Sequence, residues 1–141
     1  IVVYFEAQDL EELSPFLKQL PTIVVVDHMG RPDVTKGVDH PDFARFIKLM
    51  GECENIWSKV TCPERLSVQG PPYDDVVAYY QAIVDRFEDR VLWGTDWPHP
   101  NMKSHMPDDG ALVDYIPKIA RTVEKQRKLL VDNPMRLYWG S

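Results

Sequence analysis

A run of β-branched residues, Thr-Ile-Val-Val-Val, occupies positions 22–26 without the alternation of apolar and polar side chains that a half-exposed sheet shows. Such a run predicts a strand that is covered on both faces, as in a parallel sheet. Similar segments lie at 1–5, 55–61 and 90–95, and patterns typical of helices separate them. This alternation predicts an α/β fold with about four parallel βα units.

Two architectures accommodate such units, a doubly wound sheet and a (β/α)8 barrel. A complete barrel needs about 250 residues, and this chain has 141. We therefore expect a single domain over residues 1–141 that supplies about half of a barrel if the fold is a barrel. Because the chain opens on Ile1 within an apolar segment, we also expect that N-terminal strands of the domain are missing.

Composition excludes several classes of protein. The apolar fraction of 44% and the charged fraction of 27% are those of a globular chain. The net charge of −6 argues against nucleic-acid binding, and no apolar run approaches the roughly 20 residues that cross a membrane. Two cysteines without a secretory signal predict reduced thiols in a cytoplasmic protein. Neither Cys53 nor Cys62 has a second metal ligand at a useful spacing, so we expect no cysteine-based metal site.

Polar residues are concentrated where the predicted strands end. The carboxyl ends of parallel strands build the site in α/β folds, so these residues should meet at one rim. Taken singly, each has a structural alternative, such as a hydrogen bond to a loop, a turn cap, or neutralisation of Asp27 or Glu64 by an arginine. The candidates for the rim are His28, Arg31, Arg65, Asp96 and His99, with Tyr4 from the first strand.

Asp96 is the strongest candidate for chemistry. It precedes Trp97 on a stiff, partly apolar segment, where a carboxylate needs a compensating cation such as His28 or an arginine. A carboxylate in this position can accept a proton from water, which points to hydrolysis. Guanidinium groups bind carboxylates through paired hydrogen bonds. The residues alone therefore predict hydrolysis of a small acidic molecule.

Three motifs resemble those of the amidohydrolase superfamily, in the branch that contains lactonases. They are VDHMGRP at 26–32, GTDWPHP at 94–100 and NPMRLY at 133–138. The resemblance covers essentially the whole chain but only the C-terminal half of the family's domain, and it implies the C-terminal half of a distorted (β/α)8 barrel. Within the branch, the chain is most similar to members that hydrolyse the lactone of a pyrone dicarboxylate in the breakdown of lignin-derived aromatics.

The resemblance also implies roles for single residues. Asp96 matches the aspartate that activates the hydrolytic water, and His28 matches the histidine that polarises the lactone carbonyl. Members with this substrate are implied to need no cofactor. In the alternative, a metal-dependent lactonase or decarboxylase of the same superfamily, His28 and Asp96 would bind zinc or manganese. The positions that match substrate-binding or pocket residues are Arg65, Arg31, Tyr4 and His99.

The chain departs from the superfamily in one respect, since it has no His-x-His pair. None of its histidines is so spaced: His28, His40, His99 and His105. The chain therefore holds an incomplete site, and we expect the isolated 141 residues to be inactive without the N-terminal half of the barrel. A non-enzymatic alternative is an inert half-barrel whose unpaired strand edges associate with another chain.

Overall fold

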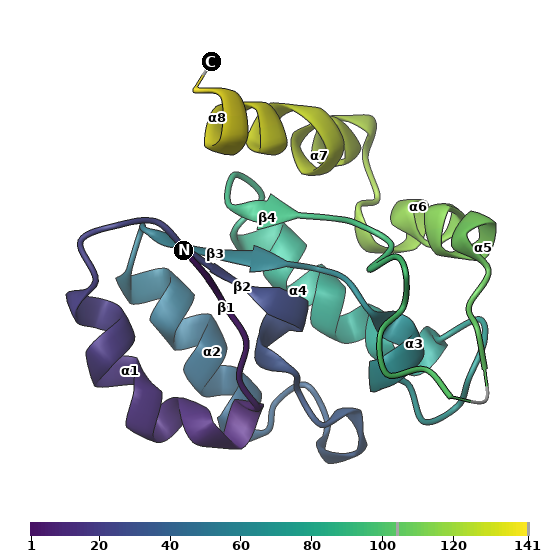
Figure 1. The fold of residues 1–141 in the computed structure, drawn as a ribbon, viewed down its shortest axis with the longest axis horizontal. Coiled ribbons are helices and arrows are strands. Elements are labelled where there is room, and N and C mark those ends of the chain that lie inside the picture. Colours follow the sequence, from purple (N-terminus) through teal and green to yellow (C-terminus); the bar gives the residue numbers. More distant parts are fainter. Residues whose placement is uncertain (104, 141) are drawn as a thin grey trace.

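The computed structural model describes residues 1–103 and 105–140. A four-stranded sheet in the order β1-β2-β3-β4 lies at its centre (Figure 1). All three strand pairs are parallel, which confirms the predicted α/β class with four parallel strands. The strands are shorter than the apolar segments that predict them: β1 Val2–Val3, β2 Val24–Val26, β3 Ile56–Lys59 and β4 Val91–Leu92.

Helices follow each strand, as the sequence pattern predicts. One of them, α3, is only four residues long. A π-helical segment, Lys128–Asp132, joins the last two helices. The helices are α1 Leu10–Gln19, α2 Pro41–Glu52, α3 Pro63–Leu66, α4 Val77–Arg86, α5 Asp109–Asp114, α6 Ile116–Ile119, α7 Val123–Arg127 and α8 Asn133–Trp139. No helix in the described part of the chain is long and apolar enough to cross a membrane.

Local chemistry sets where α2 begins. Pro41 occupies the first turn, where its missing N–H costs no hydrogen bond. His40 caps the helix, because its Nδ1 accepts a hydrogen bond from the Asp42 backbone N–H at 3.3 Å. The histidine at this position therefore has a structural role.

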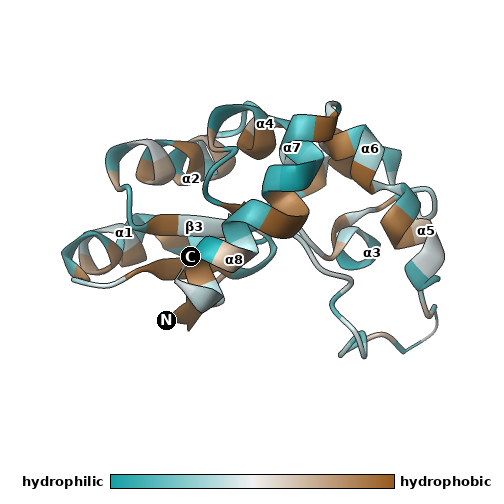
Figure 2. Ribbon diagram, turned by 90° about the horizontal axis from the view of Figure 1, so that it is seen from above, coloured by the Kyte–Doolittle hydropathy of each residue, from teal (hydrophilic) through white to brown (hydrophobic). Residues whose placement is uncertain are grey.

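The main core lies between the sheet and one layer of helices, and Figure 2 shows α2 and α4 on this side of the sheet. Val24, Val26 and Ile56 point from the strands into this core, where Phe46 of α2 and Ile83 of α4 are also buried. Each of these side chains is at most 1% exposed. We call this side of the sheet the helix-covered face.

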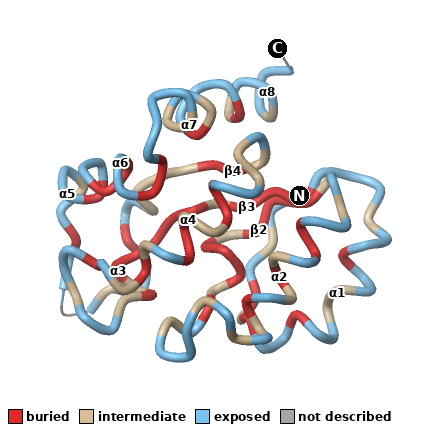
Figure 3. The backbone as a smooth tube through the Cα atoms, turned by 180° about the vertical axis from the view of Figure 1, so that it is seen from behind, coloured by how far each residue is buried: buried red, intermediate tan, exposed pale blue. Residues whose placement is uncertain are grey.

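The opposite side of the sheet, which we call the open face, has a much smaller cluster. Val25, Trp57 and Leu92 form it, and Leu137 of α8 packs against them. The Arg136 guanidinium lies 5.0 Å from the centre of the Trp57 ring. Figure 3 shows that β2 and β4 are buried, whereas much of α8 is exposed. The α8 helix therefore covers the open face only in part.

Candidate functional site

The chain makes a left-handed turn directly after β2. Four consecutive residues have positive φ values: His28 (51°), Met29 (59°), Gly30 (65°) and Arg31 (50°). This conformation costs about 1–2 kcal/mol for each residue other than glycine. A Cβ atom at Gly30 would lie 2.7 Å from Cε2 of Phe5, so glycine is required there. Strain of this kind persists where the surrounding structure enforces it, and it is concentrated at functional sites.

His28, Asp96 and Arg65 meet beyond the ends of three strands, as the sequence predicts. His28 Nε2 lies 3.7 Å from Asp96 Oδ1, and Arg65 Nη1 lies 3.7 Å from Asp96 Oδ2. Arg65 comes from α3 and also donates a hydrogen bond to the Pro100 carbonyl at 3.3 Å. Both residues that the sequence offers as partners for the Asp96 carboxylate are therefore beside it, and Arg65 supplies the positive charge.

The His28 ring is buried and held from behind. Its Nδ1 lies 2.7 Å from Thr61 Oγ1, and the residue is only 7% exposed. Burial lowers the pKa of His28, while the Asp96 carboxylate opposes this effect in part. The ring is therefore a neutral imidazole at neutral pH.

Cys62 is a member of this cluster that sequence spacing does not reveal. One ligand atom each from His28, Cys62 and Asp96 lies within 4.8 Å of the others. The expectation of no cysteine-based metal site rests on spacing in sequence, which does not reveal this proximity, because the fold joins residues that follow three different strands. Burial raises the pKa of the Cys62 thiol, so the thiol is protonated.

Arg31 lies beside this cluster and has its own partners. Its Nη1 donates to the Tyr4 hydroxyl at 2.8 Å and lies 3.4 Å from Glu6 Oε1. The Tyr4 and His28 rings meet edge to face at 6.1 Å. Asp27 pairs with Lys59 at 2.6 Å instead of an arginine. The alternative in which Arg31 neutralises Asp27 is therefore wrong.

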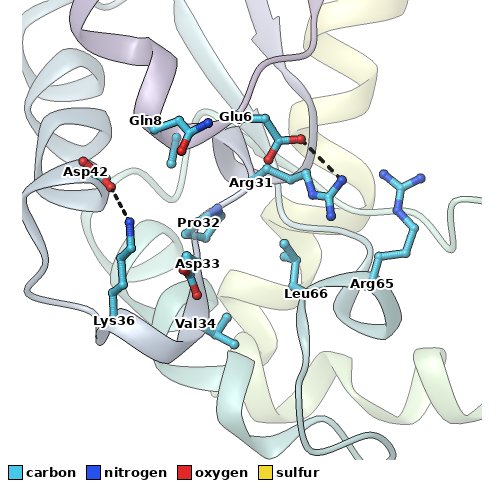
Figure 4. Close-up of a pocket in the computed structure, with 11 residues that line it drawn as sticks. Glu6, Gln8, Arg31, Pro32, Asp33, Val34, Lys36, Asp42, Arg65 and Leu66 are labelled. Atoms are coloured by element: carbon cyan, nitrogen blue, oxygen red, sulfur yellow. Dashed lines mark hydrogen bonds and ion pairs between the residues drawn. The ribbon is translucent and has the colours of Figure 1, made fainter.

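Two cavities flank the cluster. One has a volume of about 350 Å³, and Figure 4 shows Arg31 and Arg65 at its border with Glu6 and Lys36. The other has a volume of about 250 Å³, reaches the open face and is lined by both His28 and Asp96. The arginines and the His28–Asp96 pair therefore adjoin different parts of one rim. Glu6 and Lys59 are rim residues that the sequence does not single out, because ion pairing between distant segments leaves no local pattern.

His99, which the resemblance matches to a pocket position, lies between two carboxylates in the structure. The residue is 4% exposed, and its Nδ1 and Nε2 lie 3.4 Å from Glu64 and 3.0 Å from Asp109. Both ring nitrogens thus face carboxylates instead of the rim. This geometry favours a positioning role, in which His99 ties the segment after β4 to α3, which carries Arg65. It also explains why Arg65 does not neutralise Glu64.

Comparisons with known proteins match this arrangement. Residues 1–139 match the model of the amidohydrolase family called Amidohydro_2. The chain is 66% identical to the 2-pyrone-4,6-dicarboxylate hydrolase of Comamonas testosteroni, over 99% of this chain and 48% of that protein. It is 41% identical to the 4-sulfomuconolactone hydrolase of Hydrogenophaga intermedia, over 96% of this chain and 45% of that protein. The chain therefore spans about half the length of these relatives.

Solved structures share the fold over the same extent. A ligand-free crystal structure from Agrobacterium tumefaciens superposes with a TM-score of 0.85 at 29% identity, over 99% of this chain and 50% of that one. A crystal structure of a probable 2-pyrone-4,6-dicarboxylic acid hydrolase from Acinetobacter baumannii, with citric acid bound, gives 0.83 at 28% identity, over 98% of this chain and 51% of that one. The fold class thus agrees with that of amidohydrolase barrels, of which this chain matches about half.

Proposed function

Because this chain belongs to the amidohydrolase family, we propose that it is part of a lactone hydrolase that acts on 2-pyrone-4,6-dicarboxylate. The observation that carries the proposal is the cluster in which the Asp96 carboxylate lies 3.7 Å from both the His28 imidazole and the Arg65 guanidinium. The 66% identity to a hydrolase of that name supports the choice of substrate.

We propose that Asp96 is the general base. It takes a proton from water as the water oxygen forms a bond to the lactone carbonyl carbon. His28, which burial keeps neutral, donates a ring N–H to the carbonyl oxygen on which negative charge develops. The tetrahedral intermediate then collapses, the ring C–O bond breaks, and the proton on Asp96 passes to the leaving oxygen.

We propose that the arginines hold the carboxylates of the substrate. Arg65 lines the cavity of about 350 Å³, where its fork of N–H donors can reach a carboxylate while Nη1 remains near Asp96. Arg31, fixed by the Tyr4 hydroxyl, is the second candidate. Because the charge of Arg31 is already shared with Glu6, we expect Arg65 to contribute more to binding.

Two alternatives follow from the same residues. In a metal-dependent lactonase or decarboxylase, His28 and Asp96 would hold zinc or manganese, and their donor atoms are close enough to fit one ion. A bound metal ion would lower the pKa of a water molecule on it. In the other alternative, residues 1–141 are a partial domain that stays inert until the rest of the barrel completes it, since the chain spans about half of its relatives.

The test is Asp96→Asn in the complete protein that contains this chain. The amide cannot accept a proton, and general-base help is worth about 10²–10⁴-fold, so turnover should fall by at least about 10²-fold. Rates of both proteins are measured against pH with chelator present. If the variant keeps its rate and its acidic limb, Asp96 is a structural cap. If chelator abolishes the activity of the unmodified protein, the metal-dependent alternative is correct.

Arg65→Lys tests the carboxylate contact, since lysine keeps the charge but loses the paired donors. We expect the KM for the dicarboxylate to rise roughly tenfold, which corresponds to about 1.4 kcal/mol. Arg31→Lys serves as the matched comparison and should have a smaller effect. If Arg65→Lys and Arg65→Ala leave the KM unchanged for both the dicarboxylate and a monocarboxylate analogue, the assignment is wrong.

A further inference from the structure

We propose that Thr61 holds His28 in the tautomer that carries its ring proton on Nε2. Thr61 follows the end of β3 and is 4% exposed, and its Oγ1 lies 2.7 Å from His28 Nδ1. Thr61 is a positioning residue, because it acts through the imidazole. Its consequence for hydrolysis rests on the proposed function, whereas the tautomer itself does not.

The hydrogen bond between Thr61 and His28 can be made in two ways. In a neutral imidazole one nitrogen carries a proton and the other a lone pair. If Nδ1 donates to the Thr61 hydroxyl, Nε2 has the lone pair. If the hydroxyl donates to Nδ1, Nε2 has the proton. The bond that Nδ1 makes therefore determines whether Nε2 donates or accepts.

The Thr61 hydroxyl favours the arrangement in which it donates. Among the residues that the structure describes, His28 Nδ1 is the one hydrogen-bond partner of Thr61 Oγ1. If the hydroxyl accepted from Nδ1, its own proton would be buried without an acceptor, which is costly. A hydroxyl that donates to Nδ1 satisfies its proton and leaves only lone pairs unused, which proteins tolerate more often.

The opposite side of the ring favours the same tautomer. His28 Nε2 lies 3.7 Å from Asp96 Oδ1. An ionised carboxylate only accepts hydrogen bonds, so it attracts a proton on Nε2 and repels a lone pair there. The contacts on both sides of the ring therefore place the proton on Nε2.

Thr61 is itself fixed by two neighbouring elements. Tyr80 of α4 is 1% exposed, and its hydroxyl donates a 2.7 Å hydrogen bond to the Thr61 carbonyl. The preceding residue, Val60, donates its backbone N–H to the Leu92 carbonyl of β4 at 2.8 Å. The hydroxyl is therefore held beside His28 by both the sheet and the helix-covered side of the molecule.

For hydrolysis, this tautomer supplies the donor that the proposed mechanism needs. Thr61, His28 and Asp96 all line the cavity of about 250 Å³. A ring with its proton on Nε2 can donate to a carbonyl oxygen in that cavity, whereas the other tautomer can only accept there. Thr61→Val should lower kcat by about 3–10-fold, the range that one hydrogen bond between neutral groups supplies, with little change in KM. Thr61→Ser keeps the hydroxyl and should retain the rate.

The test is nitrogen NMR of the isotope-labelled complete protein without substrate, above about pH 7.5, where a histidine of ordinary pKa is neutral. Protonated and unprotonated ring nitrogens have widely separated chemical shifts, and the signals lost in His28→Gln belong to His28. We expect Nε2 to carry the proton in the unmodified protein and in Thr61→Ser. The Nδ1–H form should gain population in Thr61→Val.

Ser58→Ala is the matched control. Ser58 lies on β3 and is 0% exposed, and its hydroxyl has no hydrogen-bond partner in the described part of the chain. The substitution thus removes a second buried hydroxyl from the same segment without touching the His28 ring. It should leave both the tautomer and kcat unchanged.

Two outcomes overturn the proposal. A proton on Nδ1 in the unmodified protein shows that Thr61 accepts instead of donating, and an unchanged tautomer in Thr61→Val shows that Thr61 does not set it. If Thr61→Val does not fold, Thr61→Ala takes its place with the same expectations. If the tautomer shifts as expected while kcat does not change, Thr61 keeps its role and the proposed part of His28 in hydrolysis fails.

Discussion

The two faces of the sheet are built very differently. On the helix-covered face, strand side chains such as Val24, Val26 and Ile56 enter a large buried cluster that includes residues of α1, α2 and α4. On the open face, a cluster of only three buried side chains has Leu137 as its partner. The cavity that His28 and Asp96 line also opens on this side, next to Leu92 and Tyr138.

The two faces therefore contribute differently: the helix-covered face contributes most of the stability, and the open face adjoins the residues proposed for chemistry. Burial of apolar surface stabilises a fold by about 25 cal/mol per Å², so most of the stability must come from the helix-covered face. The open face instead holds charged groups, such as the Asp27–Lys59 ion pair at 2.6 Å, and an exposed aromatic residue, Tyr138.

The largest effect is expected at the centre of the helix-covered face. Phe46 is 1% exposed and meets the Phe5 ring edge to face at 6.4 Å. Phe46→Ala should lower the free energy of unfolding by about 3–5 kcal/mol, because a large cavity remains. Denaturant unfolding measures this. Phe16→Ala on α1, where the side chain is 60% exposed, is the control and should have little effect. Equal losses in the two variants would show that Phe46 does not anchor the core.

Neighbouring valines of β2 compare the two faces directly. Val24 is on the helix-covered face at 0% exposure, and Val25 is on the open face at 4%. Val24→Ala should cost about 2–3 kcal/mol, while Val25→Ala should cost roughly half as much, because the small cluster can relax around the gap. The same unfolding measurement tests both. A greater loss for Val25→Ala would reverse the assignment of the faces.

Two glycines test the turn that connects the core with the rim. Gly30→Ala should cost about 1–3 kcal/mol, since the new Cβ would lie 2.7 Å from the Phe5 ring and φ is +65°. Gly51→Ala on α2 meets no atom within 4 Å and should stabilise the chain by about 0.4–1 kcal/mol. Thermal unfolding should therefore shift in opposite directions. If the melting temperature rose in both variants, the turn at Gly30 would have to rearrange to accept the new Cβ atom.

The smallest expected effect is a pH dependence of the free energy of unfolding, which arises from His28 beside the open face. Burial lowers the pKa of His28 in the folded chain, so the unfolded chain binds this proton first as the pH falls. The free energy of unfolding therefore has its full value, as far as His28 is concerned, above about pH 6.5, the ordinary pKa of histidine. It decreases as the pH falls below that value. Between pH 7.5 and 5.5, the free energy of unfolding should change less steeply with pH in His28→Gln than in the unmodified protein. An unchanged slope would assign the pH dependence to other groups.

Much of this architecture can be predicted from the sequence because its signals are local. The β-branched run at 22–26 specifies a buried strand, and the positions of His28, Arg65 and Asp96 just beyond three strands are sufficient to bring them together. Because the carboxyl ends of parallel strands share one edge of the sheet, residues that are far apart in sequence can be predicted to lie close together in space.

Other features depend on contacts between distant segments and have no local signal. The spacing of Cys62 from other ligands in sequence conceals its place beside His28 and Asp96, because the ligands come from separate strands. The contacts of His99 with Glu64 and Asp109 likewise join separate segments of the chain. The helix α3 is only one turn long, too short for a periodic pattern.

The outer edges of the sheet are unequal, and this has a consequence for how the isolated chain behaves in solution. At β4, the Asn133 amide donates a 2.8 Å hydrogen bond to the Val91 carbonyl, which occupies an outward-facing acceptor. In the described chain β1 pairs only with β2, and Val2 on it is 53% exposed. A second molecule can therefore add a strand at β1 more easily than at β4. Association at β1 would follow mass action, so we expect the apparent melting temperature of the isolated chain to rise with protein concentration.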